Sequence, residues 1–317
     1  YRFNPTPPLI VVHLSLSFSF SLSLSLLADA ISYFKGGSVV RMVHAVIGAE
    51  HFRSGLALYF KRHAYGNTVT TDLWAAWEEV SGKPIGAMMA TWTEQMGFPL
   101  VTVASNAEGG AATLTQSWFL ADGSSPTEEE ISTRKPWTIP IFAASATPGQ
   151  TTPIFVGFLD ETSKTFENAS FGANTKFNAG QHVLCRTAYT DEAQFYALIE
   201  ACRAGAFEEQ DRSALLNDAY ALSKAGLLSP SLVLELAAAM CKDTSTIVWE
   251  EIESVLRAFE KLTRVRRITL FFILNTFFLL YLRRHVRFYV HTHNNTTGQR
   301  PNACPDDVIR TDDADRS

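Results

Sequence analysis

Hydrophobic positions recur at helical spacing in four segments near the start of the chain. The first two segments, 32–47 and 51–63, are separated by a predicted break at Gly48-Ala49. The third covers 70–81 and opens on Thr-Thr-Asp, which is typical of a helix N-cap. The fourth covers 84–97, from a proline to a glycine. This part of the chain is therefore expected to be helical.

After Pro99 the pattern changes to short runs rich in β-branched and aromatic residues, which Gly, Asn and Pro clusters separate. Such runs predict the strands of a small β-sandwich. They are 100–103, 112–115, 137–141 and 153–156.

Helical spacing returns after Thr190 in four stretches that short polar turns connect, which is typical of antiparallel neighbouring helices. These stretches are 192–203, 213–225, 229–241 and 246–262. The predicted fold class is therefore multidomain α+β, in the order helices, sandwich, helices.

The two ends of the chain differ from its middle. From Leu14 to Leu26 the residues alternate Leu or Phe with Ser, and this period of two indicates a strand rather than a helix. Three interpretations of 1–27 stay open: a signal peptide ending before Ala28-Asp29-Ala30, a membrane span that the serines disfavour, or low-complexity sequence that is not evolved protein.

The segment 264–317 contains an apolar run, Ile268 to Leu282, with arginines on both sides. A membrane span needs about 20 apolar residues, and flanking charges on both sides favour neither orientation. A membrane anchor is therefore the disfavoured alternative here. His291 and His293 are not expected to bind metal.

The net charge of −5 over 317 residues lacks the basic excess of a nucleic-acid-binding protein, so no nucleic-acid partner is expected. The four cysteines are far apart and have no zinc-site spacing, which predicts neither a disulfide framework nor a structural metal. Reduced thiols favour the cytoplasm, with a membrane or the secretory pathway as the alternative.

Catalytic motifs of known spacing are absent from the sequence. It contains no H-E-x-x-H, no G-x-S-x-G, no P-loop and no G-x-G-x-x-G. The runs Glu78-Glu79 and Glu128–Glu130 are expected to be solvated faces rather than catalytic carboxylates. Spacing alone therefore identifies no complete active site.

A set of local patterns nevertheless resembles one family. Tyr33-Phe34-Lys35-Gly36 is similar to the Tyr-x-Lys-Gly segment of the zinc aminopeptidases that include aminopeptidase N and the puromycin-sensitive enzymes. Further similar segments follow in family order from Asp29 to Leu262. They are Asp72–Trp74, Ser81–Ile85, Trp92–Pro99, Gln116 with Phe119, Trp137–Ile141, Arg186–Tyr189 and Asp211–Leu222.

The resemblance implies a role for one residue. In the family, the tyrosine at the place of Tyr33 donates a hydrogen bond to the oxyanion that forms when zinc-bound hydroxide attacks the scissile carbonyl. Such a donor stabilises charge that appears only in the transition state. Tyr33 is therefore the one catalytic candidate, and no cofactor-binding or metal-binding residue is assigned in this chain.

The resemblance also implies a division of the chain. We expect a low-complexity segment at 1–27, the C-terminal part of a thermolysin-like peptidase domain at 28–97 and a β-sandwich domain at 98–189. The start of an α-helical, superhelical C-terminal domain follows at 190–263, and an atypical tail at 264–317. With much of the peptidase domain missing, the apolar faces around Phe52, Leu56, Trp74 and Trp77 are expected to be exposed.

The departure from the family concerns zinc. The family binds zinc through two His of H-E-x-x-H and a downstream Glu, all before the tyrosine segment, where this chain has the Ser/Leu alternation. His44 and His51 are not expected to replace them, because the break at Gly48-Ala49 separates them. The chain is expected to be a partial product of a zinc aminopeptidase that acts on peptides, and to be inactive alone. The alternative is a non-catalytic peptide- or protein-binding module.

Overall fold

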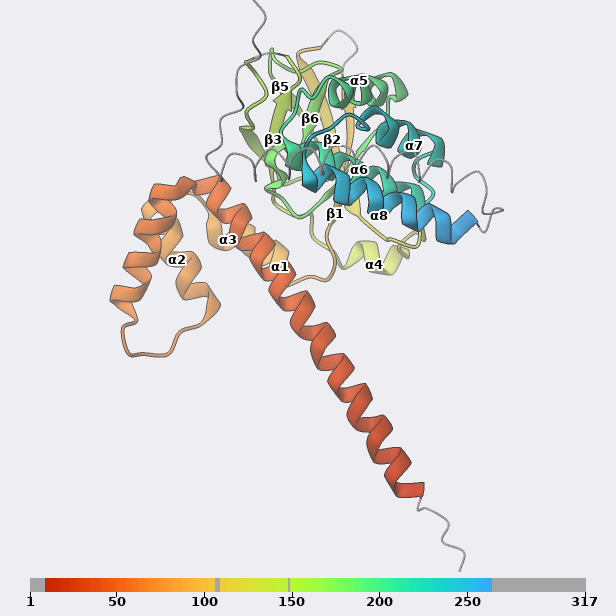
Figure 1. Cartoon of the computed structure of the whole chain (residues 1–317). Coiled ribbons are helices and arrows are strands. Elements are labelled where there is room, and N and C mark those ends of the chain that lie inside the picture. Colours follow the sequence, from red (N-terminus) through yellow and green to blue (C-terminus); the bar gives the residue numbers. More distant parts are fainter. Residues whose placement is uncertain (1–8, 106–108, 148, 264–317) are drawn as a thin grey trace, which may run out of the picture. The chain divides into compact units, whose positions relative to one another are not determined.

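We analysed a computed structural model of the chain, which describes residues 9–105, 109–147 and 149–263, with side chains from 33 to 261 outside the same two gaps. The chain divides into two compact units, residues 1–255 and 256–317, and the fold described below is that of the first. Figure 1 labels the elements. Within the described ranges, no helix is both long enough and apolar enough to cross a bilayer.

Three helices form the first block: α1 (Leu9–Arg62), α2 (Thr70–Ser81) and α3 (Ile85–Thr93). The predicted break is confirmed, because Gly48 leaves the helical region at φ 80° and ψ 162° and α1 turns sharply there (Figure 1). Gly82 ends α2 in the left-handed conformation that glycine adopts without strain. The α3 helix ends at Thr93, earlier than the predicted Gly97.

The predicted strand across the Leu/Ser alternation is wrong, since α1 is helical from Leu9 onward. A strand needs a neighbouring strand to satisfy its backbone N–H and C=O groups, whereas a helix satisfies them within itself. The apolar run at 268–282, the histidines at 291 and 293 and the rest of the tail lie outside the described residues.

The middle of the chain forms two sheets, as a β-sandwich requires. One sheet has the strand order β5-β2-β1-β7 and the other β4-β3-β6, and apolar side chains of both sheets share one core. The strands are β1 (Pro99–Ser105), β2 (Ala111–Trp118), β3 (Ile139–Ser145), β4 (Ile154–Leu159), β5 (Ser163–Glu167), β6 (Thr175–Phe177) and β7 (Arg186–Tyr189).

The four predicted β-rich runs correspond to β1 to β4, while β5 to β7 were not predicted. All but one of the neighbouring pairs are antiparallel, and β7 pairs with β1 in parallel, with Leu100 opposite Arg186. The buried Gln116 amide joins the strand β2 to the chain before β3, donating to the Trp137 carbonyl and accepting from the Trp137 N–H, both at 2.8 Å. The short helix α4 (Glu128–Ser132) is exposed, as expected for its glutamates.

Helices return after the sandwich at the predicted places. A 3₁₀ turn, η1 (Ala179–Gln181), precedes β7, and four α-helices follow it. They are α5 (Glu192–Arg203), α6 (Glu209–Lys224), α7 (Pro230–Ala239) and α8 (Thr246–Thr263). The α+β composition is therefore confirmed.

The first block is better packed than expected. Trp74 and Trp77 are buried, with stacked rings 5.6 Å apart, and Phe52 stacks on Trp77 at 4.7 Å, so their predicted exposure is wrong. The glycine at position 55 permits this packing, because a Cβ there would lie 3.2 Å from the Trp77 Cα and overlap its indole. Other apolar side chains are the exposed ones: Tyr33, Phe34, Phe60, Tyr65, Val69 and Met96.

Candidate functional site

Tyr33 lies on the exposed face of α1. Its side chain is 80% exposed and that of Phe34 is 78% exposed, whereas the opposite face of the helix is buried in the core. That buried face carries Val39, Met42, Val43, Val46 and Ile47. Among the described side chains, the Tyr33 hydroxyl has no hydrogen-bond partner. It is therefore available to a group outside this part of the chain.

Three cationic side chains fix the helix that carries Tyr33. Lys35 Nζ donates to the carbonyls of Gln95 and Gly97 at 3.3 and 3.4 Å, just beyond the end of α3. Arg41 Nη2 donates to the carbonyl of Gly180 at 2.8 Å, and Lys83 Nζ donates to that of Val46. Burial lowers the pKa of Lys35. Each contact brings a side-chain donor to a backbone carbonyl of another segment, so these contacts hold α1 against the end of α3 and against η1.

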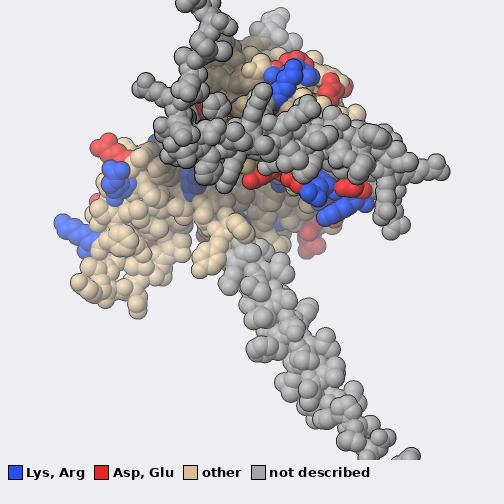
Figure 2. All heavy atoms as spheres, viewed as in Figure 1, with Lys and Arg blue, Asp and Glu red and all other residues tan. Residues whose placement is uncertain are grey.

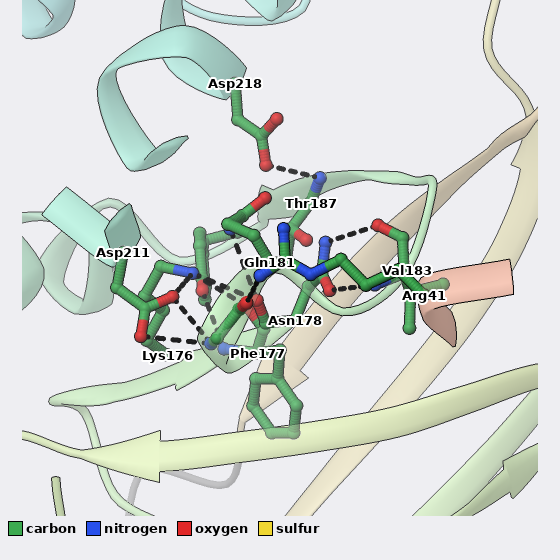
Figure 3. A network of polar contacts seen from close by, with 11 residues as sticks. Arg41, Lys176, Phe177, Asn178, Gln181, Val183, Thr187, Asp211 and Asp218 are labelled. Atoms are coloured by element: carbon green, nitrogen blue, oxygen red, sulfur yellow. Dashed lines mark hydrogen bonds and ion pairs between the residues drawn. The ribbon is translucent and has the colours of Figure 1, made fainter. Parts of the chain in front are cut away.

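A buried ion pair anchors the other side of Gly180 (Figure 3). Lys176 Nζ lies 2.9 Å from Asp211 Oδ1, and both side chains are at most 2% exposed. The Gly180 N–H donates to both oxygens of the same carboxylate, at 2.8 and 3.1 Å. The backbone of Gly180 therefore links two helices. Its carbonyl accepts a hydrogen bond from Arg41 of α1, and its N–H donates to Asp211 of α6.

A buried asparagine holds the loop that follows η1 (Figure 3), and a second ion pair joins the start of β7 to α6. Asn178 Nδ2 donates to the Val183 carbonyl at 3.0 Å, and the Val183 N–H returns to Asn178 Oδ1 at 3.1 Å. Arg186 Nη1 lies 2.9 Å from Asp218 Oδ1, and the Thr187 N–H donates to the other oxygen of Asp218 at 3.1 Å. The sandwich and α6 are therefore joined through buried charges.

No metal site forms among the described side chains, those of residues 33–105, 109–147 and 149–261, since no group of three or more His, Cys, Asp and Glu side chains is placed there to hold an ion. His44 packs edge-on against Phe52 with ring centroids 5.0 Å apart. The His51 Nδ1 atom lies 3.0 Å from the Ile47 carbonyl. Both imidazoles are thus engaged in local contacts around the break in α1.

His182 makes the stability of the chain depend on pH. Burial lowers its pKa below the usual 6.5, and the positive charge of Arg41 acts in the same direction, while Asp211 opposes them. The unfolded chain therefore takes up a proton at a higher pH than the folded chain does. The contribution of neutral His182 to the free energy of unfolding is fully present at pH values above the pKa of the unfolded state. It is lost as the pH falls below that value toward the lower pKa of the folded state.

We expect the free energy of unfolding to decrease less between about pH 7.5 and about pH 5.5 in His182→Asn than in the unaltered chain. Urea denaturation at the two pH values measures this difference. The exposed His51 provides the control, and His51→Asn should retain the full pH dependence. An unchanged dependence in His182→Asn would show that the imidazole does not cause it.

The sequence indicated Tyr33 but missed the charges around Gly180. Lys176 and Asp211 are 35 positions apart and neither belongs to a known motif, so only the fold brings them together. The signal that could have found Asp211 and Asp218 is their place in the segment Asp211–Leu222, which the resemblance had singled out. Lys176 has no comparable signal.

Two family models match this chain. The model described as the peptidase family M1 domain matches residues 23–92, which include Tyr33, Lys35, Arg41 and Lys83. The model described as the ERAP1-like C-terminal domain matches residues 175–271, which include Lys176, Asp211 and Asp218.

Relatives from distant organisms agree with these matches. Aminopeptidase 2 of Candida albicans is 34% identical over 71% of this chain and 23% of its own length. The puromycin-sensitive aminopeptidase of Caenorhabditis elegans is 33% identical over the same shares, and tricorn protease-interacting factor F2 of Thermoplasma volcanium is 34% identical over 72% of this chain and 26% of its own length. The chain thus spans about a quarter of the length of the curated relatives it matches. These matches together show that the chain belongs to the M1 peptidase family.

Proposed function

We propose that this chain is part of a zinc aminopeptidase that removes N-terminal residues from peptides, and that Tyr33 is its oxyanion donor. The observation that carries the proposal is the exposed phenol of Tyr33 within the residues that match the peptidase domain. The relatives named above as aminopeptidases support the same reaction class.

The surroundings of Tyr33 suit this role. An oxyanion donor is effective when it is already in position, because no energy is then spent on reorganising it in the transition state. Lys35, Arg41 and Lys83 hold the helix that carries Tyr33 at three points along its length. The exposed phenol can donate its proton to an oxygen that becomes negatively charged, and loss of one such donor typically costs about 100- to 1,000-fold in rate.

Zinc does not fit the described residues of this chain. M1 peptidases are zinc-dependent in general, but no cluster of ligands is present in the described ranges, and His44 and His51 are engaged in local contacts. These residues therefore supply no hydrolytic step through zinc. A phenol alone supplies no nucleophile, so we propose that the chain by itself does not hydrolyse peptides.

The purified chain should release no p-nitroaniline from alanine or leucine p-nitroanilide, with or without added zinc. Tyr33→Phe provides the matched control, because it removes only the hydroxyl of an exposed ring. The unaltered chain and this variant should give the same background. Zinc-dependent hydrolysis by the unaltered chain would show that it holds a metal site of its own, and the proposal of an inactive part would then be wrong.

A non-catalytic binding module is the second candidate, and the exposed apolar side chains favour it. Tyr33, Phe34, Phe60 and Met96 are all more than 60% exposed in the α1–α3 block. Charged side chains are sparse on the face of this block that Figure 2 shows. Exposed apolar surface of this kind often marks an interaction site. Saturable peptide binding that is independent of zinc and weakened by Phe60→Ser would favour this candidate.

We also propose a cytoplasmic location. Cys185, Cys202 and Cys241 are free thiols, which are typical of a reducing compartment. Burial raises the pKa of the Cys202 thiol to about 12, so it stays protonated and unreactive. Microscopy of the tagged full chain tests the location, and a signal confined to the secretory pathway would contradict it.

A further inference from the structure

A cavity of about 420 Å³ lies where α1, the loop after η1, α6 and the start of α8 meet. This volume is within the range of about 300–1,000 Å³ that is usual for small-molecule sites. The charged and polar side chains in its wall include Arg41, His182, Arg186, Asn217, Asp218 and Glu251. Tyr33 does not line it, whereas Arg41, which helps to hold the helix of Tyr33, does.

Hydrogen-bond donors in the wall remain unused. Arg41 donates a hydrogen bond from Nη2 to the Gly180 carbonyl. Arg186 donates from Nη1 to the side-chain oxygens of Asn217 and Asp218. The other N–H groups of both guanidiniums have no partner in the part of the chain that the structure describes. His182 Nδ1 is buried and likewise has no hydrogen-bond partner among the described residues. A buried polar group without a partner is unfavourable, so a bound ligand that offers hydrogen-bond partners to these groups would be favoured.

One carboxylate in the wall also remains without a counter-charge. Glu251 Oε1 accepts a hydrogen bond from Asn217 Nδ2 at 2.9 Å, and its Oε2 has no partner within the described ranges. Asp218 differs, because Arg186 and the Thr187 N–H occupy its two oxygens. The cavity therefore holds one guanidinium without an acidic partner, Arg41, and one carboxylate without a basic partner, Glu251.

We propose that this cavity binds a small zwitterion with a free ammonium group and a free carboxylate, such as a dipeptide. The ligand carboxylate accepts hydrogen bonds from Arg41 and Arg186, whose planar guanidinium groups match it in shape. The ligand ammonium group donates to Glu251. The proposal rests on the wall of the cavity and is independent of the proposed function.

Isothermal titration of the full chain with L-alanyl-L-alanine tests the proposal, with the dipeptide recovered intact at the end. We expect saturable binding of one dipeptide per chain. N-acetylation removes the ammonium charge and C-terminal amidation removes the carboxylate charge, and each should weaken binding by about ten- to a hundredfold, because each removes hydrogen bonds to a charged group. These modified dipeptides probe both ends of the ligand without altering the protein.

Two substitutions with matched controls test the wall itself. Arg41→Gln and Glu251→Gln should each weaken binding by about tenfold or more. Arg62→Gln on the same helix as Arg41, and Glu250→Gln next to Glu251, are exposed and should leave the affinity unchanged. The proposal is overturned if no saturable binding of the dipeptide is detected, or if the acetylated or the amidated dipeptide binds as tightly as the free one.

Discussion

Asp211→Asn is expected to lower the free energy of unfolding by about 3–5 kcal/mol, because it leaves the buried Lys176 ammonium without a counter-charge. Asp211 is fully buried and Lys176 is 2% exposed, so water cannot replace the lost partner. Asparagine has the same shape and can still accept the Gly180 N–H. The loss of stability therefore reports the missing charge rather than a cavity.

Urea denaturation followed by circular dichroism measures this effect. The exposed pair of Lys164 with Asp160 has the same separation of 2.9 Å and provides the matched control. Asp160→Asn should cost no more than about 1 kcal/mol, because solvent screens exposed ion pairs. If Asp211→Asn destabilised the chain no more than Asp160→Asn does, the ion pair with Lys176 would not support the junction of β6, η1 and α6.

Trp92→Ala is also expected to lower the free energy of unfolding by about 3–5 kcal/mol. Trp92 is completely buried, and its Nε1 donates to the Thr138 carbonyl at 3.1 Å, which ties α3 to the chain at the start of β3. Alanine leaves a cavity and also leaves that carbonyl without its donor. Both effects act on the contact between the first helical block and the sandwich.

The exposed Phe60 provides the control for this prediction, because it is 66% exposed and also belongs to the first block. Phe60→Ala should change stability by no more than about 0.5 kcal/mol. The free energy of unfolding of Trp92→Phe should lie between those of Trp92→Ala and Phe60→Ala, since phenylalanine keeps an apolar ring in the core but loses the hydrogen bond. Equal stability of Trp92→Ala and Phe60→Ala, measured by urea denaturation, would mean that α3 is not part of the core.

Local signals predicted much of the fold. Gly48 and Gly82 mark changes of direction that the chain makes at these residues with positive φ, so the helix limits near them were correct. Pro84 likewise opens α3. The end of α3 was misjudged because Gly97, which suggested it, lies beyond the true cap at Glu94.

Features that depend on distant partners could not be predicted. The strand β6 has only three residues, and β7 pairs in parallel with β1, which lies more than 80 positions earlier. Lys176 was unpredictable because lysine is almost never buried unless it is paired, and the sequence does not reveal the pairing. The alternation from Leu14 to Leu26 misled because period two predicts a strand only where a neighbouring strand exists.

The candidate functional site likewise combines a residue that the sequence indicated with contacts that depend on the fold. The resemblance to a family indicated Tyr33, whose side chain is exposed on α1, and its role stays a prediction. The contact of Arg41 with Gly180 spans 139 positions, and the cavity beside it combines residues of α1, η1, β7, α6 and α8. No local pattern carries such information, so these features emerge only from the folded chain.

The measurement that tests the proposed function most directly is the sequence of the mature transcript upstream of the Tyr33 codon, across the codon for Ala28. We predict a message that encodes H-E-x-x-H and a downstream Glu in frame before Tyr33, which would make Tyr33 a residue of a complete zinc aminopeptidase. A message that encodes Leu14 to Leu27 directly before Ala28, with no such motif upstream, would contradict the peptidase role for this chain.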